Sequence, residues 1–171
     1  KIAVTANSHK VIHNLLERIE SIANKQKFIF KGLKMGNPDN EDTYYDGKLI
    51  KTDKNEKHYI DGLKDRKILL FAGTKYHLSQ WYYQDKLDYL IVDEASQLAV
   101  ADLIALGGIA KNIVLVGDQQ QLGSVISGNH PNQSGKSVLD YLLENKDTVS
   151  PEKGIFLNRT FRLHPNINTF T

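Results

Sequence analysis

Two acidic residues, Asp93 and Glu94, follow the apolar run Tyr89–Val92 directly. An Asp at the end of a buried strand is costly to desolvate unless a cation or several hydrogen bonds compensate for its charge. Mg²⁺, held through oxygen ligands, is the usual cation of phosphate chemistry, and a neighbouring Glu can orient or deprotonate a water. The pair therefore predicts a metal ligand, Asp93, and a base, Glu94. The alternative is a pair that only caps a helix starting near Leu98.

A second polar group, Gly117 and Asp118, comes directly after the apolar run Asn112–Val116. Gly permits a sharp turn, Asp118 can reach the same metal, and an amide among Gln119–Gln121 can bond a phosphate oxygen. Alone, such a Gln-rich turn is typical of a solvated loop. Together with the acidic pair after the preceding run, it favours a phosphate site.

The segments that must position these residues alternate between two patterns. Four apolar, β-branched runs predict strands buried on both faces, at Ile2–Thr5, Lys67–Phe71, Tyr89–Val92 and Asn112–Val116, and Phe28–Leu33 is a weaker candidate. Helical spacing predicts helices at Ser8–Asn24, Ala99–Ile109 and Ser137–Leu143. This alternation predicts an α/β domain with right-handed crossovers. Because ligands bind beyond the carboxyl ends of such strands, we expect the residues that follow them to converge at one edge.

Residues 36–66 differ from the rest, since Asn, Asp, Lys and Tyr dominate and the apolar residues have no sustained period. We expect an insertion there, a hairpin or a mobile arm on the α/β core.

Three other features favour structural roles. The segment Ser134–Ser137 ends like a phosphate-binding loop, but His130 stands where the pattern requires Gly, so we expect a helix cap at Ser137 instead. The aromatic run Trp81–Tyr83 could stack bases, but core packing is the favoured interpretation. His9 and His13 lie one helical turn apart with no carboxylate or thiolate beside them, which favours packing over a metal site.

Composition sets broad limits on the function. The chain has 171 residues, enough for one domain, and contains no Cys, which excludes disulfides and thiolate chemistry. Its 22 basic and 20 acidic residues give a net charge of +2, too small to indicate a polyanion partner by itself. No apolar run approaches the ~20 residues that cross a bilayer, so we expect no membrane partner and a cytoplasmic location.

Five segments, in this order, resemble the motifs of superfamily 1 helicases. The branch is the one whose second motif reads D-E-A-S/G-Q, which includes nonsense-mediated-decay and related 5′-to-3′ helicases. The segments are Val4–Ile19, Phe71–Thr74, Leu90–Leu98, Leu115–Leu122 and Leu157–Pro165, similar to motifs Ia, Ic, II, III and the start of the next. Asn7 and Gln119 stand where the family usually has Pro. The resemblance implies a RecA-like, P-loop NTPase-type parallel sheet flanked by helices, with residues 1–171 forming part of helicase domain 1A.

The resemblance also implies roles for single residues in the use of ATP and Mg²⁺. Asp93 would bind Mg²⁺, and Glu94 would activate the attacking water. Gln121 would contact the γ-phosphate and couple it to strand movement, while Arg162 would stabilise charge in the transition state. The nucleotide-binding set implied in this way is Asp93, Gly117, Asp118 and Gln121.

Three hydroxyl residues are implied to lie along a track for single-stranded DNA or RNA. Thr5, Ser8 and Thr74 would contact phosphates through their hydroxyls and backbone N–H groups. The family's Walker A loop and second RecA-like domain are not in this sequence, so the remainder of the helicase, with or without a fused nuclease domain, is the implied partner. We expect the chain alone neither to hydrolyse ATP nor to unwind a duplex.

Two other functions compete with this one. A degenerate, non-catalytic module that binds nucleic acid or protein is the alternative, although such a module has no chemical need for Asp93, Glu94, Gln121 and Arg162 together. A metal-dependent phosphoesterase built on Asp93 and Asp118 would require further carboxylates or His residues at the strand ends, and the sequence shows no such cluster.

Overall fold

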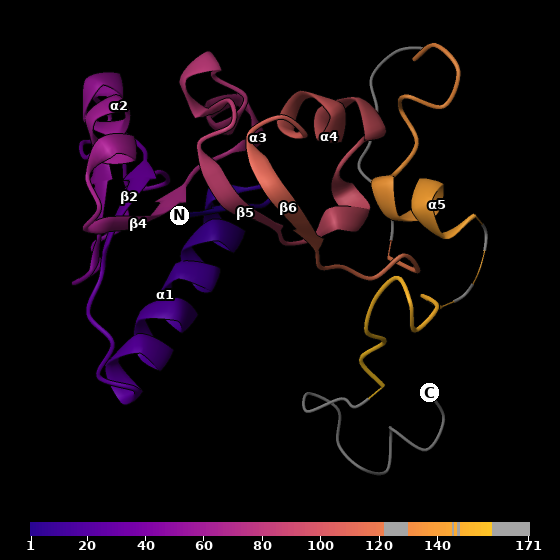
Figure 1. The fold of residues 1–171 in the computed structure, drawn as a ribbon, viewed down its shortest axis with the longest axis horizontal. Helices are drawn as coiled ribbons and strands as arrows, with labels where there is room; N and C mark the ends of the chain where they lie inside the picture. Colours follow the sequence, from indigo (N-terminus) through magenta and orange to yellow (C-terminus); the bar gives the residue numbers. More distant parts are fainter. Residues whose placement is uncertain (122–129, 145, 147, 159–171) are drawn as a thin grey trace.

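A computed structural model of the chain describes residues 1–121, 130–144, 146 and 148–158 (Figure 1). In this part of the chain, one sheet contains all six strands, in the order β3-β2-β4-β1-β5-β6, and every pairing is parallel. The strands are β1 (Ile2–Thr5), β2 (Lys31–Met35), β3 (Ile50–Asp53), β4 (Ile68–Ala72), β5 (Leu87–Val92) and β6 (Ala110–Leu115). The predicted parallel α/β sheet is therefore confirmed.

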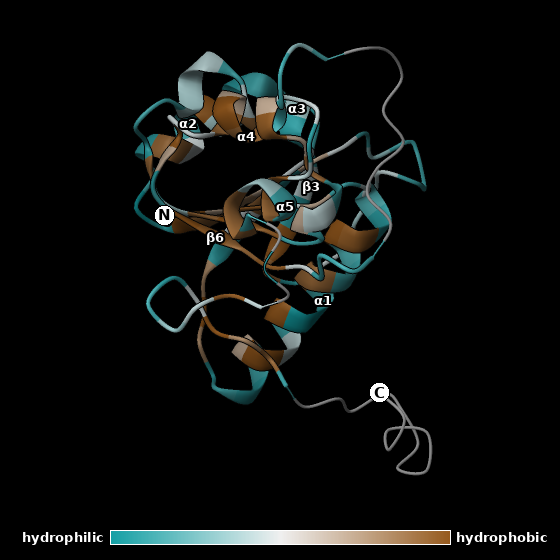
Figure 2. Cartoon of the chain, turned by 90° about the vertical axis from the view of Figure 1, so that its right-hand side faces the viewer, coloured by the Kyte–Doolittle hydropathy of each residue, from teal (hydrophilic) through white to brown (hydrophobic). Residues whose placement is uncertain are grey.

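Helices cover both faces of this sheet. They are α1 (His9–Lys25), α2 (Glu56–Lys64), α3 (Lys75–Leu78), α4 (Val100–Leu106) and α5 (Val138–Leu143), with 3₁₀ turns η1 (Trp81–Tyr83) and η2 (Ala95–Gln97). Helix α1 lies on one side of the sheet, and α2, α3 and α4 lie on the other (Figures 1 and 2). Each face has its own apolar core, because successive residues of a strand point to opposite faces.

The predicted elements agree with the observed ones to within a few residues. Ser8 caps α1, since its Oγ accepts a hydrogen bond from the Val11 N–H at 3.3 Å. The weaker strand candidate, Phe28–Leu33, corresponds to β2, which begins three residues later. Among the described residues, no helix has the length and apolar character needed to span a bilayer.

Residues 36–66 are neither a hairpin nor a mobile arm, because they contribute β3 and α2 to the domain. Ile50 of β3 and Tyr59 of α2 are completely buried. The Glu20 carboxylate on α1 accepts hydrogen bonds from the N–H groups of Lys48, Leu49 and Ile50 at 2.8–2.9 Å. The segment thus relies on a few buried side chains and on an acceptor distant in sequence, which a search for local periodicity cannot detect. That it is an insertion relative to the helicase family stays a prediction.

The loop before β3 covers the outer edge of that strand. Asp46 forms an antiparallel bridge with Lys51, and Tyr45 and Thr52 exchange two hydrogen bonds through the Thr52 hydroxyl, at 2.8 and 3.0 Å. Beneath this loop, Lys34 of β2 is completely buried, and its ammonium donates to the Thr43 carbonyl. Burial lowers the pKa of Lys34 to about 8.

The aromatic run Trp81–Tyr83 divides between core and surface. Tyr82 and Tyr83 are buried, and the Tyr83 hydroxyl lies 2.7 Å from the Nε2 of His77, so the core interpretation is confirmed for these two residues. Burial lowers the pKa of His77 to about 4, which keeps this side chain neutral in the core. Trp81 is 75% exposed and does not belong to the core.

Candidate functional site at the carboxyl edge of the sheet

Three adjacent strands, β4, β1 and β5, end at a pocket of about 220 Å³. Its lining comes from the last residues of these strands and the residues that follow them, namely Thr5, Ala6, Asn7, Thr74, Lys75, Tyr76, Val92, Asp93, Glu94, Gln97 and Leu98. The predicted convergence of polar residues at one edge of the sheet is therefore observed. Four of the predicted site residues meet here: Thr5, Thr74, Asp93 and Glu94.

The acidic pair is held by the backbone at the end of β5. The Asp93 N–H donates to the Thr5 carbonyl at 2.9 Å, and Asp93 Oδ1 accepts from the Glu94 N–H at 3.0 Å. Glu94 has φ 54° and ψ 44°, a left-handed conformation that is rare for a residue other than Gly. Residues in such strained conformations are frequent at functional sites. Here the conformation of Glu94 gives a sharp turn between β5 and η2.

Neither acidic side chain caps the helix that follows. The first N–H groups of α4, on Val100 and Ala101, donate at 3.0 Å to the carbonyls of Lys136 and Ser134. The capping interpretation of the acidic pair is therefore wrong, because those N–H groups already have partners. The same contacts show how Ser134–Ser137 is used: the segment lies against the start of α4, and Ala99 and Ser137 form an antiparallel bridge.

Asp93 fits the place of one magnesium ligand. The side chain is half-buried, and among the described residues no donor contacts its Oδ2. No group of three or more His, Asp or Glu side chains within the described ranges could hold a metal ion. Mg²⁺ in phosphate sites uses one or two carboxylates and completes its shell with water and substrate phosphates, so a single Asp matches that chemistry better than it matches a phosphoesterase metal cluster.

The turn after β6 packs beside the acidic pair but does not line the pocket. A Cβ on Gly117 would lie 2.9 Å from the Ala95 nitrogen and 3.1 Å from the Ser96 nitrogen, so the close approach of the two backbones requires glycine. Asp118 and Gln121 are exposed, and Gln121 Nε2 donates to Asp118 Oδ2 at 3.5 Å. The predicted nucleotide residues of this turn thus lie on the β6 side of Asp93.

A further predicted site residue, Ser8, is not among the residues that line the pocket. Ser8 is exposed, and its hydroxyl is engaged in capping α1. Arg162 lies outside the described residues.

Sequence reasoning did not identify three other residues of the lining, Asn7, Tyr76 and Gln97. Asn7 Nδ2 donates to Gln97 Oε1 at 2.8 Å, and Tyr76 is 73% exposed. The one signal for Asn7 was its departure from the Pro usual in the helicase family. Thr5 Oγ1 is buried and has no hydrogen-bond partner within the described part of the chain.

An all-parallel sheet with a carboxylate pair after an inner strand is the architecture of a RecA-like P-loop NTPase. The chain belongs to the AAA domain family, whose model matches residues 5–137. It is also 33% identical over 87 residues to the DNA replication ATP-dependent helicase/nuclease dna2 of Schizosaccharomyces pombe. That match covers 50% of this chain and 6% of the relative. Together these findings confirm the similarity to superfamily 1 helicases.

Proposed function

We propose that the chain is part of the first motor domain of an ATP-dependent helicase or translocase that acts on single-stranded DNA or RNA. The observation that carries this proposal is the order of the strands. Strand β5, which ends in Asp93 and Glu94, lies between β1 and β6. The acidic pair therefore separates two groups of residues, those beyond β1 and β4 and those beyond β6.

In this proposal the nucleotide binds on the β6 side. Asp93 would hold Mg²⁺, which when bound would supply positive charge to the phosphates. Glu94 accepts a proton from the attacking water, a task that its position directly after the metal ligand supports. Gly117, Asp118 and Gln121 face the same side and contact the phosphates, with Gln121 donating to the γ-phosphate. Arg162 stabilises transition-state charge.

The nucleic acid binds on the other side of the acidic pair. Thr5 and Thr74 follow the adjacent strands β1 and β4, and both line the pocket. Thr74 precedes α3 without using its side chain to cap that helix, so its hydroxyl is available to a phosphate. Ser8, the N-cap of α1, extends the track through its backbone N–H group.

The outer edge of β6 is the proposed contact for the segment that binds the triphosphate. In the described residues, β6 pairs with β5 alone. Ile113, Val114 and Val116 are 37–43% exposed. Because neighbouring residues of a strand point to opposite faces, apolar side chains are exposed on both faces of the sheet here. Strands of a parallel sheet are normally covered on both faces, so within the described part of the chain the outer side of β6 has room for a further neighbour. A Walker A strand and its helix would supply it. The other proposed partners are the second RecA-like domain and, by analogy with the helicase/nuclease dna2, a nuclease domain.

ATP hydrolysis by a version of the protein extended at its N-terminus tests the proposal. We expect hydrolysis that single-stranded nucleic acid stimulates and that Glu94→Gln lowers at least about 100-fold, the contribution of a general base. Glu41→Gln, on an exposed loop, is the matched control and should hydrolyse ATP at the normal rate. The 171-residue chain alone should not hydrolyse ATP.

A degenerate module that binds nucleic acid or protein remains the second candidate. It predicts that the extended protein binds a single strand while Glu94→Gln changes no rate, since no hydrolysis occurs. Equal hydrolysis by the Glu94→Gln variant and the unmodified protein would refute the proposed role of Glu94.

A further inference from the structure

The pocket at the ends of β4, β1 and β5 is poorly suited to a phosphate group. Ala6, Val92 and Leu98 supply apolar surface, and the carboxylates of Asp93 and Glu94 form one wall. The nearest cation in the lining, Lys75, is paired with Asp102 at 2.5 Å. A phosphate would therefore meet two carboxylates and a cation that is already neutralised, whereas a neutral ring would meet no such repulsion.

Tyr76 contributes an exposed aromatic ring to the lining of this pocket. Its side chain is 73% exposed, an unusual state for a tyrosine that lines a concave site. The ammonium of Lys75 lies 5.4 Å from the centre of the ring. Asp102 accepts a hydrogen bond from this ammonium, which holds the cation in place beside the ring. Nucleobases stack on exposed aromatic rings of this kind whatever their sequence.

Polar atoms elsewhere in the lining of the pocket match the edge of a base. The hydrogen bond from Asn7 Nδ2 to Gln97 Oε1 leaves Asn7 Oδ1 to accept and Gln97 Nε2 to donate. Thr5 Oγ1 is almost fully buried in the same lining and, in the described part of the chain, has no partner. A buried hydroxyl without a partner is uncommon, and a ligand with its own donors and acceptors would satisfy it.

We propose that this pocket receives one base of the bound single strand, stacked on Tyr76, with its edge against the Asn7–Gln97 amide pair and Thr5. The proposal rests on the proposed function, because it assumes that a single strand runs along this edge of the sheet. It assigns the base to the pocket and leaves the phosphates outside, beside Thr74. Neither Asn7 nor Tyr76 was among the predicted nucleic-acid contacts.

Fluorescence anisotropy with two labelled oligonucleotides of about 12 nucleotides tests this assignment. One is oligo(dT), and the other carries the same phosphates but an abasic sugar at every position. Loss of one stacked base should weaken binding to the 171-residue chain about 5- to 100-fold. Tyr76→Ala should weaken binding of oligo(dT) by the same factor and abolish the difference between the two ligands.

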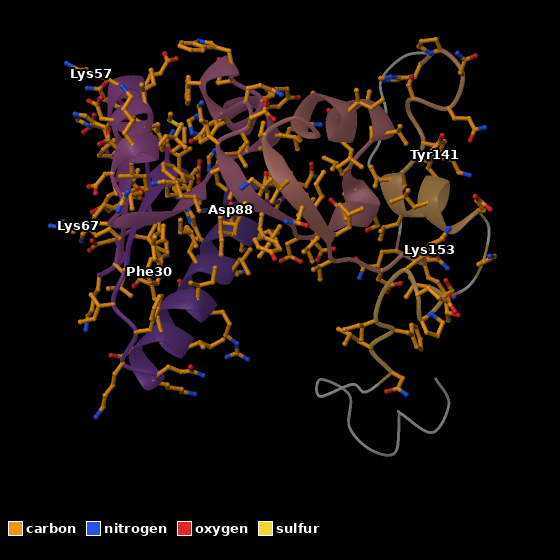
Figure 3. All side chains as sticks on the ribbon, viewed as in Figure 1. Phe30, Lys57, Lys67, Asp88, Tyr141 and Lys153 are labelled. Atoms are coloured by element: carbon orange, nitrogen blue, oxygen red, sulfur yellow. The ribbon has the colours of Figure 1, made fainter. Side chains whose placement is uncertain are left out.

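Two control variants distinguish loss of the aromatic ring from general damage to the fold. Tyr76→Phe keeps the ring and should still distinguish the two ligands, and so should Tyr141→Ala, which removes an exposed tyrosine on α5 outside the pocket (Figure 3). Replacement of thymine by 5-iodouracil should give a photo-crosslink at Tyr76 that mass spectrometry can map. Asn7→Ala should reduce the difference in affinity among dT, dC and dA homopolymers.

The outcomes distinguish the two proposals. Equal binding of the intact and abasic strands, with no effect of Tyr76→Ala, would overturn the base pocket and leave the phosphate track intact. Failure of the chain to bind either strand would overturn the track itself, and the base pocket with it. Ribose oligonucleotides of the same sequence should give the same pattern, since the contacts are to the base.

Discussion

The two edges of the sheet differ in how far the described part of the chain covers them. At β3, the chain covers its own edge: the loop before the strand bridges to Lys51, Glu20 accepts three backbone N–H groups, and Ile50 is completely buried. At β6, in the described residues, nothing pairs with the outer side, and Ile113 and Val114 on opposite faces are 37% and 43% exposed.

This difference suggests different roles for the two edges: the β3 edge is protected from pairing with other strands, whereas the β6 edge can serve as a contact surface. Natural proteins protect edge strands with charges, loops or bulges, because an unprotected apolar edge pairs with other chains. The β3 edge has that protection, in the form of Lys51, Asp46 and a covering loop. Within the described residues, the β6 edge has apolar side chains where such protection would be expected, which supports the proposal that a further strand, carrying the phosphate-binding loop, pairs with it.

The largest expected effect is a difference in stability between two variants, one with a substitution at each edge of the sheet. Ile50→Ala should lower the free energy of unfolding by about 2–5 kcal/mol, because it leaves a cavity in a packed core. Ile113→Ala should lower it by only about 1 kcal/mol in the 171-residue chain, because 37% of that residue is already exposed to water and its removal leaves no closed cavity. Urea denaturation measures both, and similar losses at the two sites would contradict the comparison.

A smaller effect concerns the acceptor that closes the β3 edge. Glu20→Ala leaves three N–H groups without their acceptor and should destabilise the chain by about 2 kcal/mol. Glu20→Gln retains one acceptor oxygen and should lose less than Glu20→Ala. Glu41→Ala, at an exposed position, is the control and should leave the urea midpoint unchanged. If Glu20→Ala were as stable as the control, the carboxylate would not be what closes this edge.

Buried Lys34 makes the stability of the β3 side depend on pH. The unfolded chain holds the Lys34 proton up to its ordinary pKa of 10.5, whereas burial lowers the pKa in the folded chain to about 8. Between these values the unfolded state binds more protons, so this residue makes the free energy of unfolding rise as the pH increases from about 8 to about 10.5. Lys34→Met should remove that rise, which urea titrations of both proteins across this pH range would reveal. Identical slopes would show that Lys34 is not protected from water.

Continuous apolar runs made the central strands predictable from sequence. Strands β1, β4 and β5 are buried on both faces, and each therefore needs an apolar run. Strand β3 reads Ile-Lys-Thr-Asp, with one apolar residue, and depends on Glu20 some thirty positions earlier. No local pattern could reveal that contact.

The residues of the candidate site likewise include some that were predictable from the sequence and some that were not. Asp93, Thr5 and Thr74 were predictable because each lies at the end of a strand or within two residues of it, and parallel strands end at the same edge. The Asn7–Gln97 pair was not, because its members are 90 residues apart in sequence. The need for glycine at position 117 likewise depends on the approach of a different segment, Ala95–Ser96.

Hydrogen exchange at β6 tests the central claim most directly. In the 171-residue chain, the outward-facing N–H groups of β6 should exchange rapidly, while those of β3 should be protected. In the protein extended at its N-terminus through a Walker A segment, the β6 groups should become protected and the β3 groups should not change. If the β6 groups exchanged equally fast in both proteins, the assignment of this edge to the phosphate-binding segment would be wrong.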